Sequence, residues 1–282
     1  MAEMIAKSEP DLLLVLLRNA MSSSSPSPGN GSTTRKNVLK VLTVASHITS
    51  PFISTFLLVH LAAPVLANVG GTSLASQTMI LGREYYQTPV GESLLVLGPI
   101  AAHYIAGISK RLLLAAPSGN QSNSDKSSPK LRPIAHRPLT SLLGLTGYAT
   151  IFLFLPIHFF VHRDNPSLPI EPISSVGPSS LDYEYVKYGL RTWPWRSWFL
   201  YTGLVSSVAL HAADGATLIW NTWFKDGWGN LSRKTRRAIA VGGVIVPVLL
   251  GLATVAREPP MIMSFLESRY HAAYTQSFAF QL

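Results

Sequence analysis

The chain has 282 residues, of which 47% are hydrophobic and only 13% are charged, and it contains no cysteine. Soluble domains carry about a quarter charged residues, so this composition is typical of a membrane protein. The absence of cysteine excludes disulfides, thiolate-ligated iron–sulfur clusters and covalently attached c-type haem. Non-covalent haem bound through histidine is not excluded.

The first 40 residues precede the first long apolar segment. Residues 10–21 predict a short helix, and the polar run 22–34 predicts a flexible tether. Acidic side chains stand where a signal peptide or a matrix-targeting sequence would need basic ones. We therefore expect residues 1–40 to be a tail that is not cleaved. A second polar tether is predicted at residues 118–130.

Five stretches reach the roughly 17–25 apolar residues that cross a ~30 Å hydrocarbon core. They cover residues 41–68, 91–116, 139–161, 198–224 and 238–256. Because lipid offers no partner to backbone polar groups, these stretches are expected to form a closed helical bundle. The predicted fold is therefore all-α and polytopic. A transmembrane domain at 41–256 lies between the tail and a C-terminal segment, 257–282, on the far side of the membrane.

The basic residues are unevenly distributed along the chain, whose net charge is +9. Sixteen of the 23 lysines and arginines lie before the first span, at the end of the second span or between it and the third, or between the fourth and fifth. The positive-inside rule places these segments and the N-terminus in the cytosol, and the C-terminus across the membrane. The charges flank spans and lack interleaved aromatic residues, which favours contact with anionic lipid over nucleic acid.

Each of the first four spans contains one histidine within its apolar run: His60, His103, His158 and His211. An ionisable side chain in hydrocarbon is energetically costly, so such residues indicate a functional site by default. The second and fourth of them are each followed, four residues later, by a glycine: Gly107 and Gly215. The other histidines near span ends are interpreted as interfacial: His47, His136 and His162.

The order His, then His-x3-Gly, occurs twice, which indicates one two-helix unit repeated. At 1.5 Å per residue, His103 and His211 share a depth near the middle of the membrane. His60 and His158 share a depth toward the far leaflet. Two such units packed around a pseudo-two-fold axis would form a four-helix bundle, flanked by the fifth span.

Two imidazoles at equal depth on facing helices are typical of a b-type haem, so His103 and His211 are predicted axial ligands of its iron. Gly107 and Gly215 would clear room for a flat macrocycle or allow close helix approach. Asp214 is placed either to orient the His211 ring or to pair with another donor. His60 and His158 are predicted to line the same haem or quinone pocket. The structural alternative is a set of histidines hydrogen-bonded across helices.

Two families resemble parts of this sequence. The segments 103–107 and 211–215 resemble the haem-ligating helices of the membrane-anchor subunits of succinate dehydrogenase. Nearly the whole chain resembles a fungal adapter family of the mitochondrial outer membrane, the MDM-ten-complementing proteins. The stretches that carry the second resemblance are 59–64, 102–107, 144–148, 156–158 and 210–215.

The second resemblance implies a non-enzymatic adapter, with its N-terminus in the cytosol and its C-terminus in the intermembrane space. It implies recruitment of a bridge-like lipid-transfer protein, vacuolar sorting protein thirteen, to vacuole–mitochondria contacts, in support of lipid homeostasis. The family's recruiting motif is Pro-x-Pro, and this chain has one, with Pro26 and Pro28 in the tether. Serines at 22–25 replace the apolar residues expected before it.

Two other functions stay open. One is a b-type haem or quinone-linked redox protein that uses His103 and His211. The other is a scramblase, in which the bundle itself moves lipid between leaflets. The endoplasmic reticulum is the alternative location, because the physics of the spans does not distinguish it from the mitochondrial outer membrane.

Overall fold

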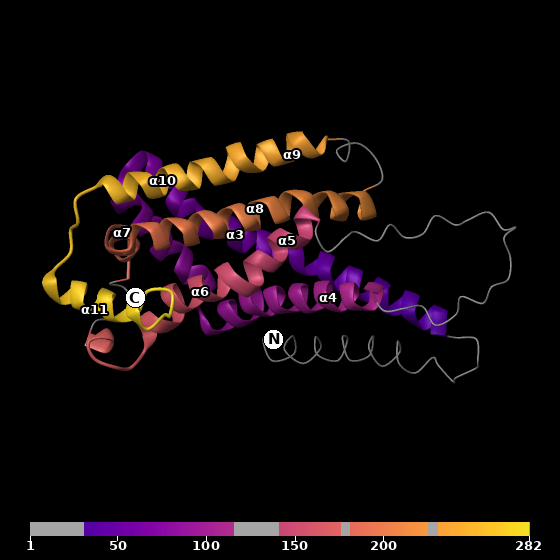
Figure 1. The fold of residues 1–282 in the computed structure, drawn as a ribbon, viewed down its shortest axis with the longest axis horizontal. Coiled ribbons are helices and arrows are strands. Elements are labelled where there is room, and N and C mark those ends of the chain that lie inside the picture. The colour runs from indigo at the N-terminus through magenta and orange to yellow at the C-terminus, as the bar shows by residue number, and fades with distance from the viewer. Residues whose placement is uncertain (1–30, 116–140, 176–180, 225–230, 282) are drawn as a thin grey trace, which may run out of the picture.

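The computed structural model describes residues 31–115, 141–175, 181–224 and 231–281, and these form a helical bundle without a strand (Figure 1). This confirms the predicted all-α membrane fold. Pro26, Pro28, most of the predicted tail and the tether at 118–130 lie outside the described residues.

The first long helix, α3 (Gly31–Tyr86), begins ten residues before the predicted start of the first span. It bends at Gly70 and Gly71, where Gly71 has a φ of 58°. This is the left-handed region, which glycine adopts without the steric penalty of a Cβ. The bend separates the predicted span from a second helical portion, residues 72–86, which the sequence did not predict.

A carboxylate from the far end of the chain holds the bend. Glu258 accepts a hydrogen bond of 3.0 Å from the backbone N–H of Thr72, at the start of the second portion of α3. An anion at this position complements the unpaired N–H groups and the positive dipole of a helix start. Hydrogen bonding from Thr72 lowers the pKa of Glu258 from its ordinary value of 4.5.

The remaining long helices follow in chain order, and several include π-helical turns. The second span consists of η1 (Gly91–Leu97) and α4 (Gly98–Ala115). The third consists of α5 (Leu142–Ala149), η2 (Thr150–Phe154), α6 (Leu155–Phe159) and η3 (Phe160–Asp164). The fourth is α8 (Pro194–Trp223), and the last consists of α9 (Arg233–Ala240), η8 (Val241–Ile245) and α10 (Val246–Arg257).

Four helices of the described chain are long and apolar enough to cross a membrane: Thr33–Tyr86, Gly91–Ala115, Leu142–Ser167 and Arg233–Arg257. The one predicted span outside this set is the fourth, α8, which has 30 residues and runs along the bundle between α5 and α9–α10 (Figure 1). α4 packs against α3, and α8 packs against α5, so the two predicted hairpins are present.

The last helix flanks this arrangement, as predicted. α10 packs against α3, where the side-chain amide of Asn68 donates a 2.8 Å hydrogen bond to the carbonyl of Pro247. Pro247 lies near the start of α10, one turn before Gly251, which faces the carbonyl of Pro64. Close backbone approach of this kind is common between helices in membranes.

Short helices form a layer over one end of the bundle (Figure 1). This cap contains α7 (Tyr183–Thr192), α11 (Ser264–Thr275), η4 (Asn165–Ser167) and η5 (Ile173–Ser175). Its core is aromatic, and Tyr185, Tyr270 and Tyr274 are at most 3% exposed. Burial raises the pKa of Tyr185 and of Tyr274 well above the ordinary value, so both phenols stay neutral hydrogen-bond donors.

The described part of the proline-rich run after the third span contains the 3-10 turns η4 and η5. The C-terminal segment forms α11, which packs on α7.

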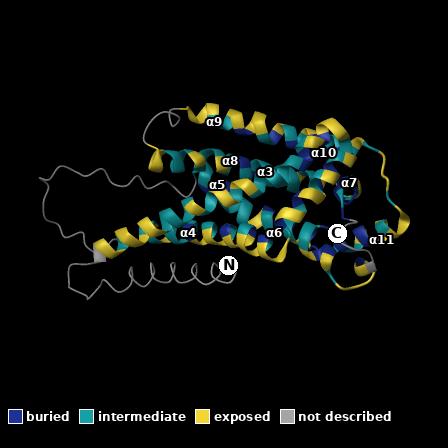
Figure 2. Cartoon of the chain, turned by 180° about the vertical axis from the view of Figure 1, so that it is seen from behind, coloured by how far each residue is buried: buried dark blue, intermediate teal, exposed yellow. Residues whose placement is uncertain are grey.

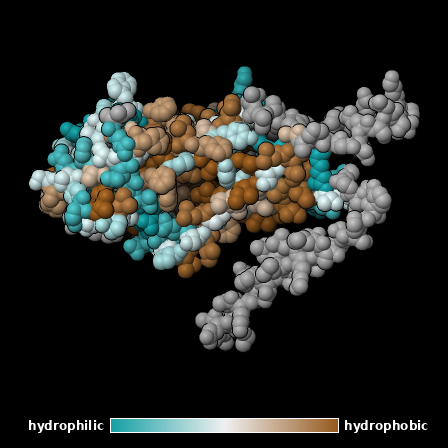
Figure 3. All heavy atoms as spheres, turned by 60° about the horizontal axis from the view of Figure 1, so that its bottom comes forward, coloured by the Kyte–Doolittle hydropathy of each residue, from teal (hydrophilic) through white to brown (hydrophobic). Residues whose placement is uncertain are grey.

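The outer surface separates into an apolar body and polar ends. Figure 3 shows hydrophobic residues gathered over the middle of the molecule and hydrophilic ones over the cap. Many large apolar side chains of the body are exposed, for example Leu58 at 75% and Leu112 at 67%, and Figure 2 shows exposed residues along α4 and α9. Such a surface suits lipid, because isolated soluble domains rarely expose contiguous apolar areas this large.

Replacement of Glu258 by Gln should destabilise the bend in α3 at neutral pH. The expected loss is about 1 kcal/mol, because the hydrogen bond to a charged group is partly exposed to solvent and screened. The carboxylate stabilises the fold fully above its ordinary pKa of 4.5, and this contribution is lost as the pH falls through the lowered folded-state pKa. In tryptophan-fluorescence melts, the difference between the thermal midpoints of E258Q and the wild type should therefore shrink as the pH falls below 4.5 and vanish below the lowered pKa of the folded state.

Glu267→Gln on α11 is the matched control, because this carboxylate is exposed and forms no ion pair in the described chain. Equal melting shifts for E258Q and E267Q at neutral pH would contradict a role for Glu258 at the bend.

Candidate functional site

The two histidines near the middle of the bundle lie next to each other, as their predicted depths require. His103 on α4 and His211 on α8 have ring centroids 6.1 Å apart, with the planes at 79°. They come from different hairpins, so this pair is the place where the two repeated units meet inside the bundle.

The same type of hydrogen bond fixes both rings. The Nδ1 of His103 lies 2.9 Å from the carbonyl oxygen of Ser46 on α3. The Nδ1 of His211 lies 3.0 Å from the carbonyl oxygen of Leu143 on α5. A carbonyl can only accept, so each Nδ1 carries the hydrogen and donates it. In a neutral imidazole, Nε2 then keeps its lone pair, which is available to a metal or a proton donor.

The two hairpins share this arrangement. In each, the histidine of the second helix donates to a main-chain carbonyl of the first helix, α4 to α3 and α8 to α5. The sequence predicted the repetition from the spacing of the histidines, and the hydrogen bonds give it a physical basis.

The glycines predicted beside these histidines do not mediate close helix contact. A Cβ added to Gly107 would meet no heavy atom within 4 Å, and one added to Gly215 would reach only Leu143, at 3.9 Å. The close approach occurs at Gly147 on α5, where an added Cβ would lie 2.9 Å from Cε1 of His211. The sequence analysis did not single out Gly147. Its spacing from Gly144, three residues earlier on the same face of α5, is the signal that could have identified it.

Asp214 fulfils the second of its two predicted roles. Its carboxylate pairs with the guanidinium of Arg237 on α9 at 2.9 Å. The His211 ring is oriented by the Leu143 carbonyl instead. The acid therefore joins α8 to α9 near the end of the bundle opposite the cap.

The second predicted pair is also brought together. His60 and His158 have ring centroids 5.8 Å apart, at 87°. The Nδ1 of His60 lies 3.3 Å from the hydroxyl of Tyr86, and the ring stacks on Phe56 at 5.3 Å. Tyr86 belongs to the second portion of α3, so the bend at Gly71 places its hydroxyl beside His60.

His162, which the sequence predicts to be interfacial, packs between the third span and the cap. Its ring lies 4.7 Å from that of His158, and its Nε2 lies 3.0 Å from the hydroxyl of Tyr201. The rings of Tyr185 and Tyr274 from the cap complete its surroundings at 5.6 and 6.1 Å. The His60–His158 pair therefore continues into the aromatic core of the cap, whereas the His103–His211 pair does not.

The described residues contain no group of three or more His, Asp or Glu side chains placed to hold a bare metal ion. A haem iron needs only two axial nitrogens, because the macrocycle supplies the others. His103 and His211 fit that donor set, since both anchored rings leave Nε2 free.

Comparison with known families identifies part of this bundle. Residues 153–258 match the family model described as MDM10-complementing protein 1, transmembrane domain. This part of the chain is therefore similar to the Mcp1-type transmembrane domain. The matched segment runs from η2 through α10 and includes His158 and His211, whereas His60 and His103 lie before it. No curated protein and no solved structure matches the chain. The resemblance to succinate dehydrogenase anchors therefore depends on the His-x3-Gly segments alone.

Replacement of Gly147 by Ala should displace the His211 ring and weaken the bundle. The new methyl group must push against an imidazole held by a carbonyl, and overpacking of this kind costs about 1–3 kcal/mol. We expect a lower thermal midpoint for G147A in detergent. Gly107→Ala, in open space on α4, is the matched control and should melt like the wild type. Equal midpoints for the two variants would contradict the packing described at Gly147.

Proposed function

We propose that this protein is a non-enzymatic adapter of the mitochondrial outer membrane that recruits a bridge-like lipid-transfer protein to vacuole–mitochondria contact sites. The observation that supports this proposal most directly is the similarity of residues 153–258 to the Mcp1-type transmembrane domain. In this account the helical bundle is the anchor. The N-terminal tail is the part that reaches the partner, a lipid-transfer protein of the vacuolar sorting protein thirteen type.

The distribution of charge in the bundle is consistent with such an anchor. The start of α3, the end of α4 and the start of α9 lie together at the end opposite the cap (Figure 1). These segments carry nine basic residues: Arg35, Lys36, Lys40, Lys110, Arg111, Arg233, Lys234, Arg236 and Arg237. Positive charge at one end favours the cytosolic side and anionic headgroups. The tail would then enter the cytosol from the same end, at Gly31.

The chemistry of the tail suits a peptide that docks in an extended form. Pro26 and Pro28 fix two backbone φ angles near −65°, so less conformational entropy is lost on binding. The partner would bind the two proline rings in an aromatic or apolar groove, as other domains bind proline-rich segments. The bundle need only keep the motif at the membrane surface.

Replacement of both Pro26 and Pro28 by Ala should release the partner while the protein stays in its membrane. The expected result is loss of the lipid-transfer protein from mitochondria in cells, measured by fluorescence co-localisation and by co-purification. The matched control removes two prolines from the predicted loop between the second and third spans, Pro129 and Pro133, and should recruit normally. Unchanged recruitment by P26A/P28A would remove the motif from the account.

A second function is favoured by one specific observation, the pair His103 and His211. We propose that this pair ligates a b-type haem through its two Nε2 atoms. When bound, haem would supply one-electron redox chemistry. The protein would position the two imidazoles through Ser46 and Leu143 and exclude water from the middle of the bundle. This role is compatible with the adapter function, because it uses the bundle rather than the tail.

A haem held in this way should give the purified full-length protein a Soret absorption band. The band should be lost in both His103→Ala and His211→Ala, because each removes one of the two side chains that would hold the haem. His271→Ala is the control, since that ring is exposed in the cap and stacks on Trp193. A colourless wild-type protein from haem-replete cells would contradict haem binding and leave the adapter proposal unaffected.

A further inference from the structure

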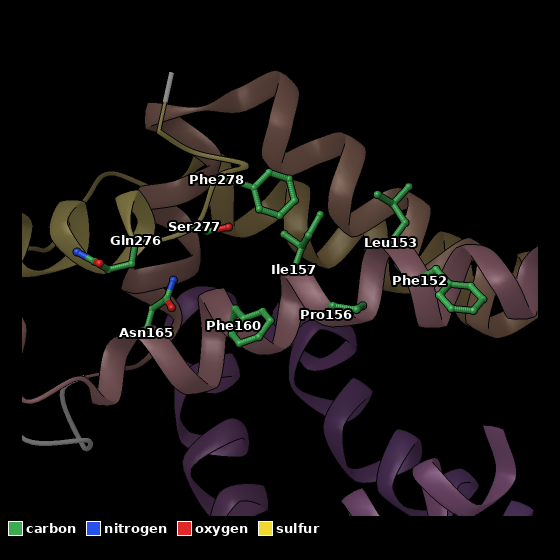
Figure 4. A pocket seen from close by; sticks show the side chains of 9 residues that line it. All are labelled: Phe152, Leu153, Pro156, Ile157, Phe160, Asn165, Gln276, Ser277 and Phe278. Atoms are coloured by element: carbon green, nitrogen blue, oxygen red, sulfur yellow. The ribbon is translucent and has the colours of Figure 1, made fainter. Parts of the chain in front are cut away.

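A groove of about 310 Å³ lies on the third span where it meets the C-terminal segment. Figure 4 shows side chains from η2, α6 and η3 along one wall and residues after α11 along the other. The lining residues are Phe152, Leu153, Pro156, Ile157, Phe160, Asn165, Gln276, Ser277 and Phe278. It is separate from both histidine pairs.

The lining changes from apolar to polar along the groove. In Figure 4, Phe152, Leu153 and Pro156 lie toward one end, while Asn165 and Gln276 lie toward the other. The polar end is next to the cap, and the apolar end points toward the middle of the bundle. A molecule that fits this groove therefore has an apolar chain and a polar end.

The polar end contains hydrogen-bonding groups that are only partly used. Asn165 is 6% exposed, and its amide donates to the carbonyl of Ala273 at 3.1 Å, while its Oδ1 makes no hydrogen bond within the described chain. Ser277 is also 6% exposed, and its Oγ accepts from the backbone N–H of Ala279. The hydroxyl hydrogen of Ser277 has no acceptor among the described residues. Asn165 Oδ1 is not one of the fully buried unpaired atoms of the described chain, so it is open to a hydrogen-bond donor, and the Ser277 hydroxyl can donate to an ester oxygen of a ligand.

The lined segment is long enough to cross one leaflet of a bilayer. From Phe152 to Asn165 the helical rise is about 20 Å, and half of a hydrocarbon core is about 15 Å. The mouth is flanked by exposed apolar rings, Phe152 at 62%, Phe160 at 49% and Phe278 at 73%. On a membrane-spanning helix, the medium that contacts such rings is acyl chain.

The helix that forms the groove is irregular on both sides of α6. The π-helical turns η2 and η3 flank it, and Pro156 lacks an N–H to donate within α6. Single π turns in helices often occur at functional sites. Here they widen the third span where the groove is lined.

We propose that the groove binds one glycerophospholipid of the leaflet adjacent to the cap. One acyl chain lies along Phe152–Phe160, and an ester carbonyl accepts a hydrogen bond from the hydroxyl of Ser277 or the amide of Gln276. The site goes beyond recruitment of a partner and does not depend on the tail or on haem. It provides a fixed position for a lipid on the side of the membrane opposite the basic end.

Photo-crosslinking in vesicles tests this proposal with the full-length protein. The probe is a phosphatidylcholine with a diazirine in one acyl chain, mixed at low fraction into phosphatidylcholine vesicles, and the labelled peptides are identified by mass spectrometry. Leu153→Trp fills the apolar part of the groove and should reduce labelling of residues 152–160 severalfold. Leu250→Trp is the matched control, because Leu250 is a similarly exposed leucine on α10, at 56% against 43%. It should leave that labelling unchanged.

The polar end is tested by retention of lipid after purification in detergent. Native mass spectrometry should find one phospholipid on the wild type and on L250W, and loss of it on L153W and on Ser277→Ala with Gln276→Ala. The melting temperatures of all variants check that the bundle is folded. Equal labelling and retention in L153W and L250W would overturn the proposal. Loss of a dimer in L153W without loss of lipid would overturn it too, because the occupant would then be a second copy of the chain.

Discussion

The imidazoles inside the bundle must find partners without water, and this requirement determines how the helices meet. In each hairpin, the histidine of the second helix donates to a carbonyl of the first, His103 to Ser46 and His211 to Leu143. These bonds turn each ring so that Nε2 is free, and they bring the two rings within 6.1 Å of each other. One polar contact therefore sets the packing within each hairpin and the chemistry available between them.

The second histidine pair is held by a different set of contacts. His60 finds its partner in Tyr86, which only the bend at Gly71 can deliver, and His158 finds His162. From there the ring contacts continue through Tyr201 into the tyrosines of the cap. The cap thus contacts the bundle through aromatic and imidazole rings. At the basic end, the ion pair of Asp214 with Arg237 connects α8 to α9. The repeat is visible near the middle of the bundle and diverges toward the cap.

The sequence predicted the features that depend on spacing along one helix. The depths of the four histidines follow from the rise per residue, so both pairs can be predicted from the sequence. The features that it missed depend on contacts between distant segments. The bend at Gly71 is held by Glu258, 187 positions later, and nothing near Gly71 indicates that partner. The buried Lys187, 1% exposed, pairs with Glu184 at 2.6 Å and donates to the carbonyl of Pro259 at 3.1 Å, and the second partner is distant in the sequence.

The candidate site shows the same division. Gly107 and Gly215 were predicted beside the central pair from a repeated motif, yet the glycine that His211 requires is Gly147 on another helix. The position of Asp214 allows it either to orient the His211 ring or to pair with another donor. In the structure it pairs with Arg237 on α9. Two assignments, haem to the central pair and recruitment to Pro26 and Pro28, are predictions from the chemistry of the residues. Neither follows from helix packing.

The central claim is that histidines of equal depth face each other across two hairpins, and cross-linking tests it directly because the native chain has no cysteine. Cysteine pairs would replace the histidines, and a short bifunctional thiol reagent would be applied in membranes. The account predicts efficient cross-linking of H103C/H211C and of H60C/H158C. It predicts none for H103C/H158C, because His158 lies about 16 Å along the third span from Gly147, the residue that contacts His211. Equal cross-linking of the matched and mismatched pairs would contradict it.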